Sequence, residues 1–125
     1  MLYRGTIRFV DYQGARLGAA EYDIASLLFD PYVSMLNNDI RYQILDYYIT
    51  KSGRPVTRDT FHSAAVQRLA QALGAYGNLS LHKGKDSYRE YIPPALNLLS
   101  QVLTKDNRFP AMRSIVEECY KRTRE

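Results

Sequence analysis

Apolar residues recur at helical spacing over most of the chain, and only its beginning has the pattern of a β-strand. Residues 6–10 are rich in β-branched and aromatic side chains and predict a strand. Arg4 and Gly5 predict a tight turn before it, with Leu2 and Tyr3 as a short preceding strand. The sequence therefore predicts a mainly α fold, with about five helices and a short N-terminal β-hairpin.

The first two predicted helices differ in how much of their surface is apolar. Residues 21–29 are apolar almost all round, which predicts a buried helix. Pro31 should end this helix, because the residue before a proline avoids the helical region. In the next helix Asn37 or Asn38 supplies the N-cap and Gly53 the stop. The apolar side chains of that helix form one stripe, made of Ile40, Ile44, Leu45 and Tyr48.

Three further helices are predicted in the second half of the chain. Thr57 caps a helix that we expect to end near Leu73, because glycines at positions 74 and 77 loosen the segment after it. The next helix spans residues 87–103, and Pro93 and Pro94 should start or kink it. The last helix begins at Pro110. Its apolar residues are spaced to share one inward face, and they are Met112, Ile115, Val116, Cys119 and Tyr120.

Length and composition limit the class of protein. The 125 residues predict one domain over 1–125, with a strand and turn in 1–18 and helices in 19–125. A content of 46% hydrophobic and 24% charged residues is typical of a globular protein and excludes collagen-like and disordered classes. No apolar run approaches the roughly 18 residues of a membrane span, so no membrane partner is expected. Cys119 is the single cysteine, which favours a cytoplasmic location and a place in the core as a small apolar side chain.

The net charge of +4 raises the question of nucleic-acid binding. The basic residues, however, are scattered along the chain and interleaved with acidic ones. This distribution favours a solvated basic surface, and no nucleic-acid partner is predicted. The 11 tyrosines fall mostly at helical spacing, which favours packing over base stacking.

Three aspartates are candidates for chemistry. Asp11 lies at the carboxyl end of the predicted strand, where a carboxylate can bind a hard cation such as Mg²⁺; alternatively, it forms a turn with nearby backbone amides. Asp23 lies in the first turn of a helix, where the helix dipole alone would favour it. Asp30 precedes Pro31 and can serve simply as a helix stop.

Other catalytic patterns have no support in the sequence. His62 and His82 are far apart and lack partners at zinc-binding spacing. None of the serines lies in a Gly-x-Ser-x-Gly elbow, and no glycine-rich phosphate loop is present.

Two stretches of sequence resemble the C-terminal lobe of the aminoglycoside phosphotransferase/choline kinase-like family. Residues 7–18 contain the strand and Asp-aromatic-x-Gly motif, and residues 22–33 contain Tyr-Asp-x-Ala-x-Leu-Leu, in the family's order. Residues 66–77 and 91–96 are similar to the bacterial sugar and amino-sugar kinases of that family. The resemblance implies an ATP-dependent phosphotransferase that acts on a hydroxyl of a sugar, amino sugar or aminoglycoside.

The resemblance also implies roles for individual residues. Asp11 matches the metal-binding aspartate that would hold Mg²⁺ with ATP, the counterpart of the DFG aspartate of protein kinases. Asp23 matches the aspartate that braces the catalytic loop. Asp30, Gln67 and Arg68 match positions where an acceptor-sugar pocket is expected.

The family's catalytic loop, His-x-Asp followed by Asn, and its glycine-rich N-terminal lobe have no counterpart in these residues. We therefore expect the catalytic aspartate upstream of Met1, and an isolated chain that is inactive and binds no ATP measurably. We also expect the strand at residues 6–10 to pair with a second copy, giving a homodimer. The alternative function is a non-catalytic helical interaction or oligomerisation module.

Overall fold

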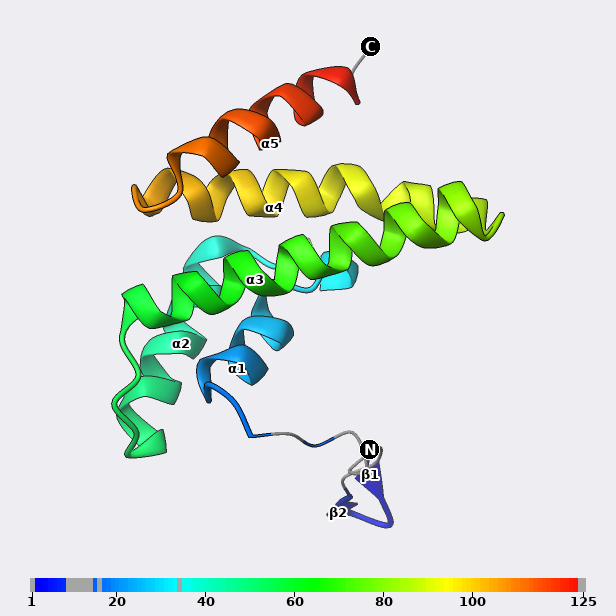
Figure 1. Cartoon of the computed structure of the whole chain (residues 1–125). Coiled ribbons are helices and arrows are strands. Elements are labelled where there is room, and N and C mark those ends of the chain that lie inside the picture. The colour runs from blue at the N-terminus through cyan, green and yellow to red at the C-terminus, as the bar shows by residue number, and fades with distance from the viewer. Residues whose placement is uncertain (1, 9–14, 16, 34, 124–125) are drawn as a thin grey trace.

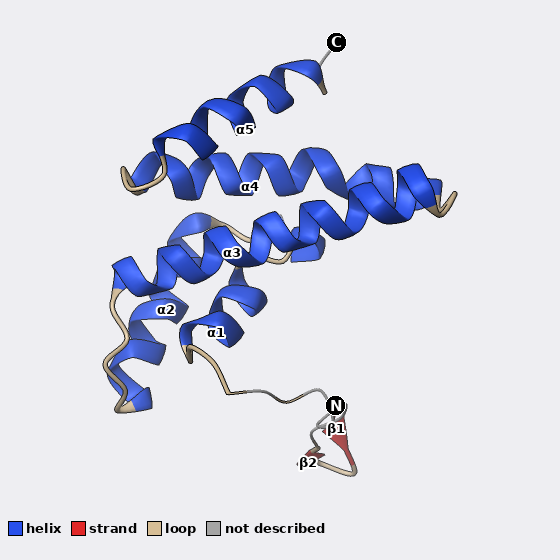
Figure 2. Cartoon of the chain, in the orientation of Figure 1, coloured by secondary structure: helices blue, strands red, loops and turns tan. Residues whose placement is uncertain are grey.

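In a computed structural model, which describes residues 2–8, 15, 17–33 and 35–123, most of the described backbone is helical (Figures 1 and 2). The α-helices are α1 (Glu21–Leu28), α2 (Asn38–Ser52), α3 (Arg58–Gly77), α4 (Ile92–Lys105) and α5 (Pro110–Arg122). Shorter helical segments are η2 (Pro31–Val33), η3 (Asn78–His82) and η4 (Asp86–Tyr91). The predicted mainly α fold, with five α-helices in the described residues, is confirmed.

The hairpin at the start of the chain has the predicted turn. Strands β1 (Leu2–Tyr3) and β2 (Thr6–Ile7) are antiparallel, with Leu2 opposite Ile7. Arg4 and Gly5 have φ of 46° and 75°, so both turn residues lie in the left-handed region that two-residue hairpin turns require. The strand was expected to reach residue 10; it ends at Ile7, and residues 9 and 10 lie outside the described residues. Figure 1 shows the hairpin apart from the helical body.

The core lies where α3 packs against α1 on one side and α4 on the other, and α5 covers the far side of α4 (Figure 1). Its largest fully buried side chains include Phe29, Phe61, Leu69 and Leu99. The rings of Phe29 and Phe61 have centroids 5.7 Å apart. Because these residues come from α3 and the elements on either side of it, α3 is the central helix of the fold.

Local signals place most helix ends correctly. The Asn37 side chain accepts a hydrogen bond from the Asp39 amide at the start of α2, and Gly53 ends that helix with φ of 62°. Thr57 and Thr60 form a capping box at the start of α3. Pro93 and Pro94 lie in the first turn of α4, which begins at Ile92 after η4. The prediction that these prolines start a helix is confirmed.

The expected end of α3 near Leu73 is wrong, because the helix continues through both glycines to Gly77. Tyr76, on the added turn, is 5% exposed and packs in a cluster with Ala72 and Ala95. Glycine in a helix costs only about 1 kcal/mol relative to alanine, and burial of a tyrosine ring offsets this cost.

The expected inward stripe of α5 is only partly buried. Val116 is buried, but Ile115 is 61% exposed and the thiol-bearing Cys119 is exposed. The prediction that Cys119 is a core side chain is therefore wrong. Met112, Ile115, Val116 and Cys119 of this stripe line an open apolar groove between α5 and the α3–α4 pair. No helix in the described part of the chain has the length and apolar character to cross a bilayer.

Candidate functional site

A polar cleft of about 980 Å³ opens beside the N-terminal end of α1. This volume is in the range of small-molecule sites. Its walls come from the segment that leads into α1, from α1 itself, from α2 and α3, and from the loop that joins α2 to α3. The lining residues are Ala15, Leu17, Gly18, Ala19, Ala20, Tyr22, Asp23, Tyr48, Arg54, Gln67 and Gln71.

The crossing of α1 and α3 positions the polar side chains of the cleft. The Tyr22 hydroxyl donates a hydrogen bond to Oε1 of Gln71. Ile24 and Ala25 are buried on the inner face of α1, which leaves the neighbouring Asp23 exposed at the cleft. Gln67 lies four residues before Gln71 and so shares its face of α3. The cleft thus combines one carboxylate with two neutral amides.

Tyr48 connects α2 to the entrance of α1. Its hydroxyl lies 3.5 Å from the Ala20 carbonyl oxygen, to which it donates. This contact joins the last residue before α1 to the second helix, and both residues line the cleft.

Arg54 comes from the short loop after α2. The left-handed Gly53 turns the chain, and the Arg54 amide donates to Oγ of Ser52 at 3.3 Å. The Val56 amide donates to the Arg54 carbonyl at 2.7 Å, and Val56 itself is 6% exposed. The backbone on both sides of Arg54 is therefore held, while its side chain is exposed and lines the cleft.

Asp30 and Arg68 form an ion pair with each other and are not among the residues that line the cleft. Arg68 donates from Nη2 to Oδ2 of Asp30 at 3.1 Å and from Nε to Oγ of Ser26 at 2.9 Å. The other carboxylate oxygen of Asp30 accepts from the Tyr32 amide at 2.9 Å. The helix α1 ends at Leu28, two residues before Asp30, and Asp30 ties this end of the helix to α3 through Arg68.

The predicted site residues that the structure describes therefore lie in two places. Asp23 and Gln67 line the same cleft, whereas Asp30 and Arg68 form an ion pair of their own. Asp11 lies outside the described residues. The metal-binding, bracing and acceptor roles of these residues stay predictions.

A tyrosine cluster lies beside Asp30 and was expected only as general packing. The cluster consists of Tyr32, Tyr76, Tyr88 and Tyr91, and the centroids of its contacting ring pairs lie 4.4–6.4 Å apart. Burial, with added effects of Tyr32 and Asp30, raises the pKa of Tyr76 to about 12. Tyr76 therefore stays neutral at physiological pH, and the cluster joins η2 and η4 to the end of α3.

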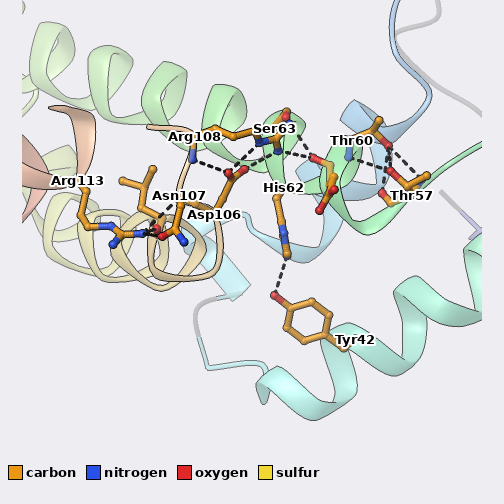
Figure 3. Close-up of polar contacts among 11 residues, drawn as sticks. Tyr42, Thr57, Thr60, His62, Ser63, Asp106, Asn107, Arg108 and Arg113 are labelled. Atoms are coloured by element: carbon orange, nitrogen blue, oxygen red, sulfur yellow. Dashed lines mark hydrogen bonds and ion pairs between the residues drawn. The ribbon is translucent and has the colours of Figure 1, made fainter. Parts of the chain in front are cut away.

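A second polar network joins α2, the start of α3 and the α4–α5 loop (Figure 3). The Tyr42 hydroxyl lies 3.2 Å from Nε2 of His62, which is 7% exposed. Burial lowers the pKa of His62, although Asp106 opposes the shift. Hydrogen bonds from Arg108 lower the pKa of Asp106 to about 2, and Arg108 also donates to the Asp59 carbonyl at 2.8 Å. These side chains are bonded to one another and to the backbone, so we assign the network a role in holding α2, α3 and the α4–α5 loop together.

The described residues contain no group of three or more His, Cys, Asp or Glu side chains that could hold a metal ion. His62 bonds to Tyr42, and His82 is exposed at the end of η3. The described residues therefore provide no zinc site.

The polar side chains of the cleft that were not predicted as site residues are those of Tyr22, Tyr48, Arg54 and Gln71. One signal could have identified Gln71, because it lies one helical turn after Gln67. No comparable signal existed for Arg54, since its place depends on how the α2–α3 loop meets α1.

The sequence is similar to the N-acetylmuramate/N-acetylglucosamine kinase of Neisseria meningitidis serogroup B (strain ATCC BAA-335 / MC58). The two are 33% identical over 110 residues, which is 82% of this chain and 33% of that protein. The chain thus spans about a third of the length of this curated relative and is related to a bacterial sugar kinase over most of its own length. No family model matches the sequence, and no solved structure matches it.

Proposed function

We propose that this chain is the C-terminal, acceptor-binding part of an ATP-dependent phosphotransferase that phosphorylates a hydroxyl of a sugar or amino sugar. The observation that carries the proposal is the similarity to a bacterial sugar kinase over 82% of the chain. The polar cleft supports it, because amide side chains such as those of Gln67 and Gln71 can hydrogen-bond sugar hydroxyls. The finer assignment, to the C-terminal lobe of the aminoglycoside phosphotransferase/choline kinase-like family, is part of the proposal.

The nucleotide side of the reaction depends on Asp11. A carboxylate at a strand end is suited to Mg²⁺, and Mg²⁺ bound with ATP would neutralise charge on the transferred phosphoryl group. Asp11 lies outside the described residues, and the described ones provide no alternative metal cluster. The proposal for Mg²⁺ and ATP therefore rests on the order of residues 7–18 alone.

The acceptor side depends on the cleft. Gln67 and Gln71 can donate to and accept from hydroxyl and acetamido groups. Asp23, exposed at the same cleft, is proposed to brace the catalytic loop of the active protein. Asp30 and Arg68 hold the C-terminal end of α1 against α3 and so support the wall that carries Asp23.

We propose that the isolated 125-residue chain has no phosphotransferase activity. Phosphoryl transfer depends on positioning the acceptor hydroxyl and neutralising charge on the phosphates, and this chain contains no His-x-Asp loop followed by Asn. The match covers 33% of the relative, and the remaining two thirds of that protein could contain a catalytic loop and a nucleotide-binding lobe.

The test is a steady-state kinase assay of the longest in-frame gene product that contains residues 1–125, with amino sugars, hexoses and aminoglycosides as acceptors. Asp11→Asn should lower kcat by about 10²–10³-fold. Asp23→Asn should lower it by about 10–100-fold. Asp46→Asn, in an exposed ion pair with Arg58, is the matched control and should leave kcat unchanged. Unchanged rates in both the Asp11 and the Asp23 variants would contradict the assigned roles.

A non-catalytic interaction module is the second candidate, and one observation favours it. An apolar groove of about 930 Å³ runs between α5 and the α3–α4 pair, and Met112, Ile115 and Cys119 line it. Exposed apolar surface of this kind often marks a contact with another molecule. If the in-frame product transfers no phosphate to any sugar, this candidate becomes the better account.

A further inference from the structure

The polar cleft contains two charged side chains that are not paired with each other. Asp23 comes from α1 and Arg54 from the α2–α3 loop. Among the residues that the structure describes, neither makes an ion pair, whereas Arg58, Arg68, Arg108 and Arg122 each pair with a carboxylate. Arg54 is therefore a guanidinium that lines a binding-sized cleft and has no counter-ion among the described residues.

The loop presents Arg54 in a defined place. Gly53 with its positive φ, the Ser52 hydroxyl and the buried Val56 hold the backbone on both sides of it. A held backbone lowers the entropy lost when the side chain binds a ligand.

We propose that Arg54 recognises a carboxylate on the acceptor, so that the cleft binds an acidic sugar in preference to its neutral counterpart. A guanidinium matches a carboxylate through two parallel hydrogen bonds, which a neutral hydroxyl cannot reproduce. Asp23 repels a carboxylate, so it favours an orientation that places the carboxylate of such a sugar at Arg54. This inference rests on the proposed function, since it assigns the acceptor to this cleft.

N-acetylmuramate and N-acetylglucosamine form a matched pair of probes, because they differ by one lactyl ether that carries a carboxylate. Each sugar is titrated into the 125-residue chain, and amide chemical shifts are followed by NMR. We expect shifts at residues 17–23, 54, 67 and 71, with a Kd about tenfold lower for N-acetylmuramate, as expected for one charge-assisted contact. Raising the salt concentration should reduce this preference.

Three variants locate the preference. Arg54→Gln should abolish it, and Arg54→Lys should keep part of it because the charge remains. Arg58→Gln, in the first turn of α3 and paired with Asp46, is the matched control and should retain it fully.

The outcomes distinguish the role of Arg54 from sugar binding by the cleft. Equal affinity of the wild-type chain for both sugars, or a preference that survives Arg54→Gln, would overturn the role of Arg54 and leave sugar binding intact. Absence of shifts at the cleft with either sugar would overturn both the role of Arg54 and the acceptor site of the proposed function.

Discussion

His62 is a buried ionisable side chain surrounded by charges from three elements. It contacts Tyr42 of α2, and the charged groups that face it are Asp59 on its own helix and Lys105, Asp106 and Arg108 around the α4–α5 loop. Burial dominates and lowers its pKa from the ordinary value. The unfolded chain therefore binds a proton at His62 more readily than the folded chain does.

We predict that stability falls as the pH decreases through about 6.5, the usual histidine value. Above that pH His62 is neutral in both states and its contribution is fully present; below it the unfolded state gains the proton first. Asp106, with a pKa of about 2, stays ionised over this range and does not contribute. Urea unfolding at pH 7.5 and 5.5 measures the effect.

His62→Gln should flatten this pH dependence, because the replacement does not titrate. His82→Gln is the matched control, since His82 is exposed, and it should leave the dependence as in the wild type. Equal behaviour of the two variants would contradict the role of burial at His62.

Two ion pairs that involve α3 differ in burial, and the difference predicts a difference in stability. The side chains of Arg68 and Asp30 are 21% and 24% exposed, against 58% and 52% for Arg58 and Asp46. Arg68→Met leaves a half-buried carboxylate without its cation and should lower the free energy of unfolding by about 1–3 kcal/mol. Arg58→Met should cost less than about 1 kcal/mol. Urea titrations that gave the same loss for both would show that burial does not set the strength of these pairs.

At the scale of single elements, the signals that worked were caps and prolines. Thr57, Asn37 and Gly53 act within one helical turn, so the sequence contains all the information they need. The end of α3 was not predictable in this way. It depends on Tyr76 packing against η4 and α4, which are distant in sequence.

The residues of the candidate site could be predicted only in part. Asp23 and Gln67 were identified through a sequence resemblance, and both line the cleft. Arg54 and Tyr48 enter the cleft only because α1, α2 and the α2–α3 loop meet there. The prediction of Cys119 as a core residue is wrong because the groove between α5 and the α3–α4 pair is open, which leaves its side chain exposed.

Two glycines in different backbone conformations should respond oppositely to alanine. Gly74 lies inside α3 with ordinary helical geometry, and an added Cβ would meet no atom within 4 Å. Gly74→Ala should therefore raise stability by about 0.5–1 kcal/mol. Gly53 has a φ of 62°, so Gly53→Ala should lower the free energy of unfolding by about 1 kcal/mol. Thermal unfolding of the two variants checks both signs, and a destabilised Gly74→Ala protein would contradict the helical assignment at that position.

At the scale of the whole molecule, the N-terminal hairpin leaves apolar side chains in solvent. Leu2 and Ile7 are 72% and 73% exposed, and Figure 1 shows the hairpin apart from the helices. We predict that two copies of the 125-residue chain associate through these strands at tens of micromolar. Light scattering should give twice the mass of 14.4 kDa, and Ile7→Lys should shift it to the monomer. A wild-type chain that stays monomeric at this concentration would contradict the prediction.

The central claim is that this chain is part of a sugar phosphotransferase. Labelling of the product tests this claim most directly. The in-frame gene product that contains residues 1–125 is incubated with N-acetylglucosamine, Mg²⁺ and ATP radiolabelled at the γ-phosphate. Our account predicts a labelled sugar phosphate, formed by the wild type and nearly absent with Asp11→Asn. Label that stays on ATP or appears only as inorganic phosphate, with every sugar tried, would contradict it.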